Sequence, residues 1–274
     1  MTKKRRKKQK KSQYTAKTAD KHILYEKSVQ NVEADVEFLN DTFKKKRGRM
    51  PLTLREDFCG TAALCAEWVR NKPKRKAVGL DLDTETLAWG TKRNIEPLGK
   101  AAKRVKLLER NVMDGTKDKS DIVCAFNFSY NIFKDRATLL DYFKAARKGV
   151  KRGGALFLDI HGGSELSEEG AESKEFDGFT YVWDQGPFCA ITNEAMRFIH
   201  FEFPDGTMLK EAFVYDWRFW GIPEVRDMLT EAGFRDVEVY WEGATDDGEG
   251  DGEFVPRGSA EQEMSWIAYV VAWV

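Results

Sequence analysis

The chain has 274 residues, of which 42% are hydrophobic and 12% aromatic, and its 45 Lys and Arg residues balance 45 Asp and Glu residues. This apolar content predicts one domain with a substantial core rather than two independent domains. No apolar run is long enough to cross a bilayer, so the sequence excludes a membrane-spanning helix.

The first 13 residues, MTKKRRKKQKKSQ, are mostly Lys and Arg and contain almost nothing that can be buried. We therefore expect a disordered basic tail over residues 1–19. No apolar segment follows the basic block, as a secretory signal requires, so we expect a cytoplasmic protein. The tail either solubilises the protein or weakly holds RNA or an acidic partner by neutralising its charge.

Residues 20–43 place apolar side chains at helical spacing, which predicts one or two helices within a segment that ends near residue 50. The residues of this stripe are Ile23, Tyr25, Val29, Val32, Val36, Phe38 and Leu39.

The stretch LTLREDFCGTAALC, residues 52–65, reads as a strand, a tight turn at Gly60 and a helix that opens at Thr61. This pattern is typical of the first βα turn of a doubly wound sheet, where ligands bind beyond the carboxyl ends of the strands. A dinucleotide fingerprint needs G-x-G-x-x-G, and here Gly60 is the only glycine. The phosphate-loop pattern is absent as well. An adenosyl ligand without phosphates fits this turn best.

Further strand and helix patterns alternate along the chain. One strand ends in Asp81, about 20 residues after the turn, where a carboxylate can accept from both ribose hydroxyls. The helix that follows is expected to end before Pro97. Later strands lead to Asn111, to the segment NFSYNIF and to His161. The pattern predicts a parallel α/β sheet.

The segment from residue 179 to residue 219 breaks this alternation, because its period-two pattern and its turn Pro204-Asp205-Gly206 predict antiparallel strands. After a helix at IPEVRDMLTEAGF, two strands end the chain. Between them, ATDDGEGDGEF resembles a calcium loop, but Gly258 stands where a bidentate Glu is required. We predict an acidic surface loop.

The four cysteines, Cys59, Cys65, Cys124 and Cys189, form no C-x-x-C pair, and the three histidines are far apart in sequence. We therefore expect neither a metal site nor a disulfide framework. All four cysteines fall in segments expected to be buried, and free buried thiols suit a reducing compartment.

The run E-D-F-C-G-T-A, followed by the strand that ends in Asp81, resembles the first motifs of class I S-adenosyl-L-methionine-dependent methyltransferases. The resemblance implies a doubly wound, Rossmann-like α/β sheet of seven strands whose last strand is antiparallel. It also implies a helical lid over residues 20–50 and a methyltransferase domain over residues 51–274, with a small antiparallel β insertion at about 162–219. The implied cofactor is S-adenosyl-L-methionine (SAM).

The resemblance also implies roles for the residues at the strand ends. Asp81 would bind the ribose, Asn111 the adenine amine, and either Glu56 or Asp57 the methionine ammonium; alternatively, Asn111 only shapes a turn. The cofactor-binding residues implied in this way are Glu56, Asp57, Cys59, Gly60, Thr61, Asp81, Leu82, Asn111, Val112 and Asn127. The pattern departs from the family at Phe58 and Ala62, which replace glycines.

The expected reaction is methyl transfer to the N or O atom of a small organic acceptor, because the antiparallel insertion would wall the crevice. For catalysis, His161 or Tyr130 would act as the base, and Tyr25 in the lid would reach the sulfonium. The alternatives are that Tyr25 only packs in the core and that His161 only holds a loop. At the level of function, the alternatives are an RNA or protein methyltransferase and a nonenzymatic RNA-binding protein that uses the basic tail.

Overall fold

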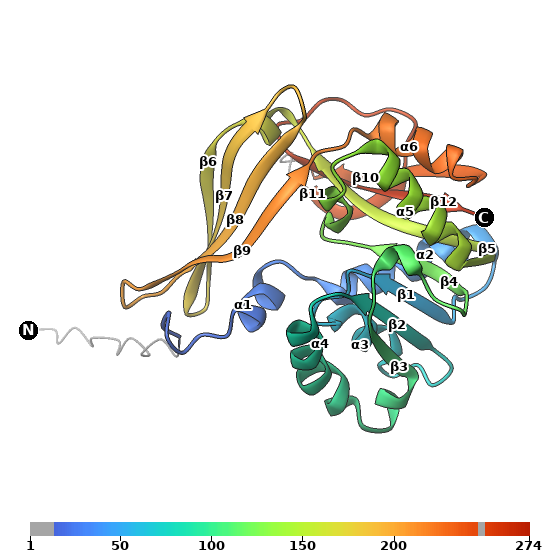
Figure 1. Ribbon diagram of the computed structural model, residues 1–274, viewed down its shortest axis with the longest axis horizontal. Coiled ribbons are helices and arrows are strands. Elements are labelled where there is room, and N and C mark those ends of the chain that lie inside the picture. Colours follow the sequence, from blue (N-terminus) through green and yellow to red (C-terminus); the bar gives the residue numbers. More distant parts are fainter. Residues whose placement is uncertain (1–13, 246–249) are drawn as a thin grey trace, which may run out of the picture. The chain divides into compact units, whose positions relative to one another are not determined.

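The computed structural model describes residues 14–245 and 250–274 and divides the chain into two compact units (Figure 1). The larger unit comprises Asn31–Glu168, Cys189–Glu194 and Trp217–Val274, and the rest of the described chain forms the smaller unit. The basic block of residues 1–13 and residues 246–249 of the predicted acidic surface loop lie outside the described residues.

The larger unit is built on one sheet, whose described strands follow the order β11-β10-β12-β5-β4-β1-β2-β3. Strands β1 to β5 are parallel, and β12 runs antiparallel to both β5 and β10. The chain order reverses between β1 and β4, which makes their carboxyl ends the switch point of the sheet. The strands are β1 (Thr53–Asp57), β2 (Lys76–Asp81), β3 (Val105–Glu109), β4 (Ser120–Ala125), β5 (Val150–Gly162), β10 (Asp236–Ala244), β11 (Gly250–Pro256) and β12 (Trp266–Trp273).

This topology confirms the predicted doubly wound, Rossmann-like fold with a late antiparallel strand. It also adds β11, where the sequence had indicated only an acidic loop, and that interpretation is wrong for Gly250–Pro256. The segment pairs with the edge of β10, and the Phe254 ring lies 4.7 Å from the Tyr269 ring. Edge pairing leaves the acidic side chains in solvent, so their charge does not prevent a strand there.

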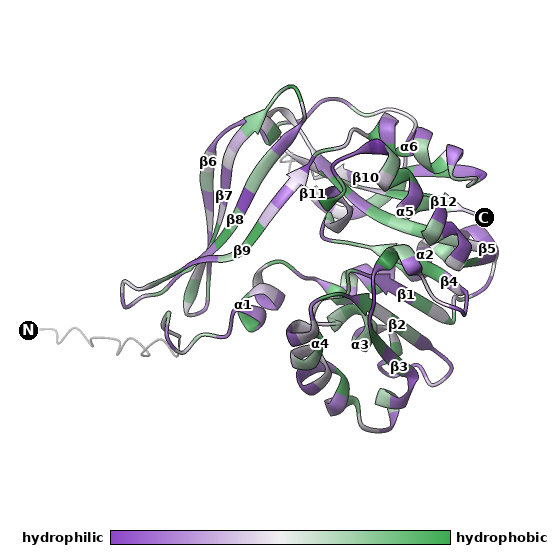
Figure 2. Ribbon diagram, in the orientation of Figure 1, coloured by the Kyte–Doolittle hydropathy of each residue, from purple (hydrophilic) through white to green (hydrophobic). Residues whose placement is uncertain are grey.

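Helices cover both faces of the larger sheet, and the sheet separates two hydrophobic cores. On one face, α2, α3 and α4 bury Leu39, Leu64 and Leu87 against β1. On the other face, α5 and α6 bury Leu139 and Val225 against β4 and β5. Hydrophobic residues follow one another along β4 and β5, as expected for strands buried on both faces (Figure 2). The helices are α2 (Val32–Arg47), α3 (Ala63–Val69), α4 (Thr84–Gly90), α5 (Arg136–Gly149) and α6 (Ile222–Glu231).

The sequence had predicted that the helix after β2 ends before Pro97, but helical structure continues past that residue. It continues from α4 through a π-helical turn, Thr91–Ile95, into a 3-10 segment, Glu96–Arg104. Pro97 lies at the start of that last segment, where its missing N–H leaves no hydrogen bond unmade. Shorter 3-10 segments also follow β3, β4 and β5, at Val112–Asp114, Ser129–Ile132 and Ser164–Ser167.

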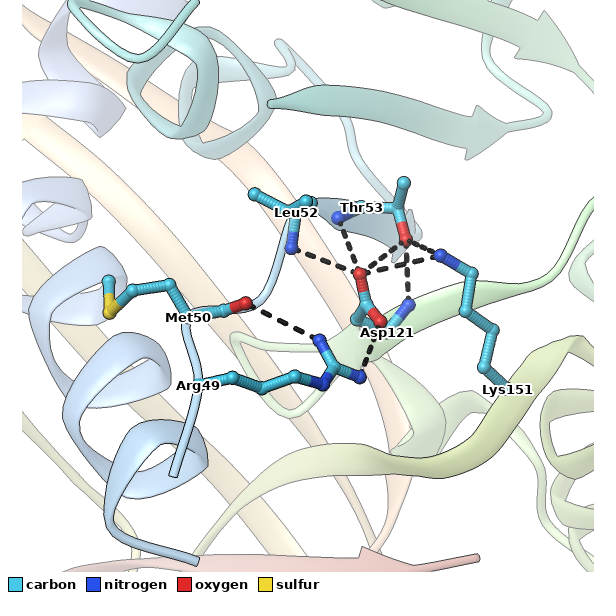
Figure 3. Close-up of polar contacts among 6 residues, drawn as sticks. All are labelled: Arg49, Met50, Leu52, Thr53, Asp121 and Lys151. Atoms are coloured by element: carbon cyan, nitrogen blue, oxygen red, sulfur yellow. Dashed lines mark hydrogen bonds and ion pairs between the residues drawn. The ribbon is translucent and has the colours of Figure 1, made fainter. Parts of the chain in front are cut away.

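The amino end of the sheet is held by Asp121 at the start of β4 (Figure 3). One carboxylate oxygen accepts from the N–H groups of Leu52 and Thr53, each at 3.0 Å, and the other accepts from Arg49 at 3.0 Å. Lys151 of β5 lies 3.4 Å away. Burial opposes ionisation of this carboxyl, but the hydrogen bonds prevail and lower its pKa to about 2. Asp121 thus ties β1, β4 and β5 together at the edge opposite their carboxyl ends.

The smaller unit contains helix α1 and a four-stranded sheet of order β6-β7-β8-β9. Its core packs Leu24 of α1 against Phe179, Ile199 and Phe201. Polar and apolar residues mix along β7, β8 and β9, as in a sheet with one buried face (Figure 2). The elements are α1 (Lys21–Ser28), β6 (Gly170–Phe176), β7 (Phe179–Cys189), β8 (Glu194–Glu202) and β9 (Met208–Arg218).

Two expectations from the sequence need correction: the end of the disordered tail and the burial of Cys189. Residues 14–19, expected in the disordered tail, are ordered, because the Tyr14 ring packs edge-on against Phe179 and Ala16 N–H donates to Thr207 Oγ1. Cys189, expected to be buried, is exposed, whereas the other three cysteines are buried free thiols. Across the described part of the chain, no helix is both long and apolar enough to cross a membrane.

Candidate active site

The turn after β1 adopts a backbone geometry that normally requires glycine. Phe58, Gly60 and Ala62 have φ angles of 59°, 49° and 56°, in the left-handed region that L side chains rarely enter. Hydrogen bonds hold the turn, because Cys59 N–H donates to Leu80 O at 3.0 Å and Ala62 N–H to Cys59 O at 2.7 Å. The turn therefore keeps the shape of a three-glycine loop although two of its glycines are replaced.

Two glycines from other elements make room for this turn. A Cβ on Gly90 would lie 2.2 Å from Thr61 O, and one on Gly79 would lie 2.6 Å from Cys59 Sγ. Neither position tolerates a side chain without a shift of the turn. A Cβ on Gly60, by contrast, would meet no atom within 4 Å. The surroundings thus fix the turn and leave open space on its Gly60 side.

Asp81, at the end of β2, is joined to the same turn. Its Oδ2 accepts from Gly60 N–H at 2.7 Å, and its Oδ1 accepts from Asp83 N–H at 3.0 Å. A carboxylate can accept further hydrogen bonds through its remaining lone pairs. Leu82 follows with 64% of its side chain exposed. The structure thus brings the expected residues Gly60, Asp81 and Leu82 together at the carboxyl ends of β1 and β2.

Glu56 and Asp57 point to opposite faces of β1, as adjacent strand residues do. Asp57 is committed to a buried ion pair: it accepts from Arg55 Nε and Nη2, both at 2.8 Å, and from the Tyr142 hydroxyl at 3.1 Å. Its carboxylate is therefore occupied on the α5 face of the sheet. Of the two alternatives left open by the sequence, Glu56 is the carboxylate that remains for a ligand.

Glu56 is 8% exposed, and its Oε2 accepts from Cys65 N–H at 3.1 Å. Among the described residues it forms no ion pair with a Lys or Arg. Burial raises its pKa to about 8, and the nearby charges of Asp35 and Asp81 act in the same direction. A buried carboxyl of this kind favours a cationic ligand, because a cation would compensate the charge that burial disfavours.

Asp35 of α2 belongs to this region and was missed by the sequence analysis. Its Oδ1 accepts from the Tyr269 hydroxyl at 3.2 Å, and burial raises its pKa to about 6. Its charge also raises the pKa values of Glu56 and Asp159. The only sequence signal was an acidic residue beside the apolar stripe of a helix.

Where the chain is described, no three His, Cys, Asp or Glu side chains are close enough to hold a metal ion.

Asn111 is exposed and caps the short helix after β3, where its Oδ1 accepts from Met113 N–H at 2.9 Å. This is the turn role that the sequence left open as the alternative, and the amide oxygen keeps a second lone pair for a ligand. Val112, its neighbour, is 4% exposed and packs in the core against α5.

Asp159 of β5 joins the end of that strand to the turn that follows β4. Its two oxygens accept from Asn127 N–H at 2.6 Å and from Phe128 N–H at 2.9 Å. Burial raises the Asp159 pKa to about 8 in spite of these hydrogen bonds, which lower it. Asn127, expected at the cofactor, therefore serves this turn through its backbone.

Tyr130 lies in the core, where its side chain is fully buried and its hydroxyl donates to Asp159 O at 2.9 Å. Burial raises its pKa well above the ordinary value. A phenol that is buried, protonated and engaged in this way cannot take a proton from a substrate. The catalytic role expected for Tyr130 is wrong, because its short helix turns the ring inward.

His161, near the end of β5, is half-buried among aromatic rings. Its ring centre lies 4.1 Å from that of Phe128, 5.3 Å from Phe219 and 6.2 Å from Trp217. Tyr25 belongs to the smaller unit, where its ring packs 4.7 Å from Phe213. The roles expected for His161 and Tyr25 stay predictions.

No protein-family model and no curated protein matches the sequence, whereas several solved structures share the fold. A SAM-dependent methyltransferase from Clostridium acetobutylicum has a TM-score of 0.68 at 16% identity, with 92% of this chain and 97% of that chain covered. CalS10, an amino pentose methyltransferase from Micromonospora echinaspora, has a TM-score of 0.65 at 15% identity, with coverage of 92% and 96%. The sugar N-methyltransferase KedS8 from Streptoalloteichus has a TM-score of 0.62 at 17% identity, with coverage of 93% and 94%. The chain shares their fold.

Proposed function

We propose that the protein transfers a methyl group from SAM to a small organic acceptor, through a nitrogen or an oxygen atom. The observation that carries this proposal is the turn from Phe58 to Ala62, which keeps a three-glycine backbone and is joined to Asp81 through Gly60 N–H. Such a turn admits an adenosyl group close to the backbone. The shared fold with SAM-dependent methyltransferases supports the same assignment.

The residues at the strand ends fit the parts of SAM in turn. Asp81 has lone pairs for the two ribose hydroxyls, and the exposed Leu82 offers an apolar surface to the adenine. Asn111 keeps an acceptor for the adenine amine. Glu56 would hold the methionine ammonium, because it is a buried carboxyl with no basic side chain paired to it among the described residues.

The charge of the site also suits a cationic donor. Burial raises the pKa values of Glu56 and Asp159, and the nearby charge of Asp35 raises both further, so a cation would be favoured beside this group of carboxyls. When bound, SAM supplies a methyl group on a positively charged sulfur, already activated for in-line attack. The protein's part is then to bind, orient and exclude water, and these effects carry most of the rate in such a reaction.

We further propose an amine as the preferred acceptor. KedS8 is a sugar N-methyltransferase and CalS10 an amino pentose methyltransferase. An amine carries a positive charge at neutral pH until it is deprotonated, so the acidic strand ends favour it over a neutral alcohol. The attacking species is the neutral amine, formed when the ammonium gives its proton to solvent, so with an amine nucleophile His161→Gln should reduce turnover only slightly. With an alcohol it should reduce turnover by about 10² or more, because a base is then needed.

Two measurements test the proposal. Calorimetry should show binding of SAM but not of NAD, and Asp81→Ala should weaken it, whereas Asp118→Ala, at an exposed carboxylate on a loop, should leave it unchanged. A metabolite extract incubated with a labelled methyl donor should then yield a labelled small amine, identified by mass spectrometry. Tight NAD binding without a response to SAM, or label found only in RNA or protein, would overturn the proposal.

A further inference from the structure

We infer that Asp159 is a positioning residue for the acceptor: its carboxylate holds the turn at Asn127 and Phe128, and through that turn it sets the Phe128 ring against His161. This inference rests on the proposed function, because it names the residue that shapes the acceptor side of the same site. Nothing in the shared fold or in the sequence motifs assigns Asp159 this role.

The turn needs such support because its backbone is strained. Asn127 and Phe128 have φ angles of 58° and 56°, two successive non-glycine residues in the left-handed region. Single residues, mainly Gly and Asn, visit this region, and a phenylalanine there is unusual. Strained backbone persists only where the surroundings over-determine it, and it concentrates at functional sites. Here the two N–H groups converge on one carboxylate, one on each oxygen.

Asp159 itself is rigidly placed. It lies inside β5, opposite Tyr269 of β12, and its neighbour Leu158 pairs with Ala125 at the end of β4. Its carbonyl oxygen accepts from the fully buried Tyr130 hydroxyl. The carboxylate is therefore anchored in the sheet, and it transmits that fixed position to the loop that follows β4.

The consequence is the position of one aromatic ring. Phe128 and His161 are both half-buried, with their ring centres 4.1 Å apart, and Trp217 and Phe219 complete the group. Phe128 lies three residues after the end of β4, at the switch point between β4 and β1, and His161 is the next-to-last residue of β5. A molecule that approaches there meets a ring whose place depends on Asp159.

The same geometry argues against Asp159 as a base. Both of its oxygens already accept backbone N–H groups, so the carboxyl group is engaged in holding the turn. An asparagine at this position would keep one acceptor and turn its own NH₂ toward the other backbone N–H. Asp159→Asn therefore changes one hydrogen bond of the turn and hardly alters side-chain size.

The test uses proton NMR of the histidine rings, which needs neither SAM nor an acceptor. The chain has three histidines, and His161→Gln identifies the His161 resonances. In the native protein these should be displaced by the ring current of Phe128. Phe128→Leu removes the ring directly and so gives the chemical shifts of His161 without that ring current. Asp159→Asn should move the His161 chemical shifts toward those values. Asp141→Asn, at an exposed carboxylate of α5, should leave them in place.

Turnover gives the second readout, with the acceptor found by the labelling screen. Asp159→Asn and Phe128→Leu should each raise the acceptor KM at least about tenfold, the scale of one lost binding contact, while the Kd for SAM changes less than threefold. Unchanged His161 resonances in Asp159→Asn would overturn the inference. So would an equal loss of SAM affinity and acceptor affinity, which would mean a general structural role. If Asp159→Asn does not fold, Phe128→Leu serves as the test: it should raise the acceptor KM while the Kd for SAM stays nearly unchanged. Failure of the native protein to bind SAM would instead refute the proposed function.

Discussion

If Glu56 holds the methionine ammonium as proposed, its burial makes the affinity for SAM depend on pH in a way that can be calculated. The pKa of this carboxyl is raised from 4.5 to about 8. At pH 7, one unit below that value, only about one in eleven of the side chains is ionised. A methionine ammonium binds the ionised form, so the proton must leave first, at a cost of about 1.4 kcal/mol for each pH unit below the pKa.

SAM affinity should increase with pH, because only the ionised form of Glu56 binds the ammonium. SAM binding should release a proton, and it should tighten as the pH rises toward 8. Between pH 6 and pH 7 the Kd should fall about tenfold, and at pH 7 each bound SAM should release about 0.9 proton. Glu56→Gln has no proton to lose, so its weaker Kd should be nearly constant over this range.

Calorimetry measures both quantities, because titrations in two buffers with different heats of ionisation give the number of protons released. Asp35→Asn is the control for the neighbouring carboxyl, whose pKa of about 6 leaves it largely ionised at pH 7. It should keep most of the proton release. If the native protein and Glu56→Gln released equal numbers of protons, Glu56 would not be the ligand of the ammonium and the reasoning would fail.

Three other substitutions test separate parts of the structure. Asp81→Ala removes the acceptor of Gly60 N–H and the acceptor that we propose for the ribose. Calorimetry should show SAM binding weakened by about 2 to 4 kcal/mol, tens to hundreds of fold; an unchanged Kd would remove Asp81 from the site. Asp57→Asn breaks the buried pair with Arg55 and should lower the free energy of unfolding in urea by about 3 to 5 kcal/mol. It should have little effect on the SAM Kd of the folded protein. A large loss of SAM affinity with little loss of stability would instead make Asp57 the ammonium ligand. Asp121→Asn should lower the free energy of unfolding at neutral pH by about 2 kcal/mol, because the folded-state pKa of about 2 lies below the usual 3.8. That stabilisation is complete above pH 3.8 and is lost as the pH falls through 2, so a loss that persisted unchanged at pH 2 would contradict the assignment.

The fold class could be predicted from the sequence because its signals are local. Strand, glycine turn and helix follow one another at residues 52–65 and return at Asp81, and the change to a period of two after residue 179 marks the antiparallel strands. The acidic residues at the end of β1 and the carboxylate at the end of β2 were proposed for the same reason. Each is fixed by its place at the end of a strand.

Tertiary structure alone decided how those residues are used. The sequence allowed either Glu56 or Asp57 as the ligand, and the contacts of Asp57 with Arg55 and Tyr142 are the reason that we propose Glu56. Tyr130 reads as a candidate base, yet its helix turns the ring into the core. Such outcomes depend on partners distant in sequence, which a local pattern does not contain.

The clearest case is the turn after β1. Phe58 and Ala62 stand where the family pattern has glycines, so the sequence by itself does not predict a glycine-type backbone for the loop. In the folded protein both residues adopt the glycine conformation. Hydrogen bonds from the turn to Leu80 and Asp81 hold it, and the bare Cα atoms of Gly79 and Gly90 leave it room. Propensity states what a residue prefers in isolation, and the packed surroundings supply the energy that overrides it.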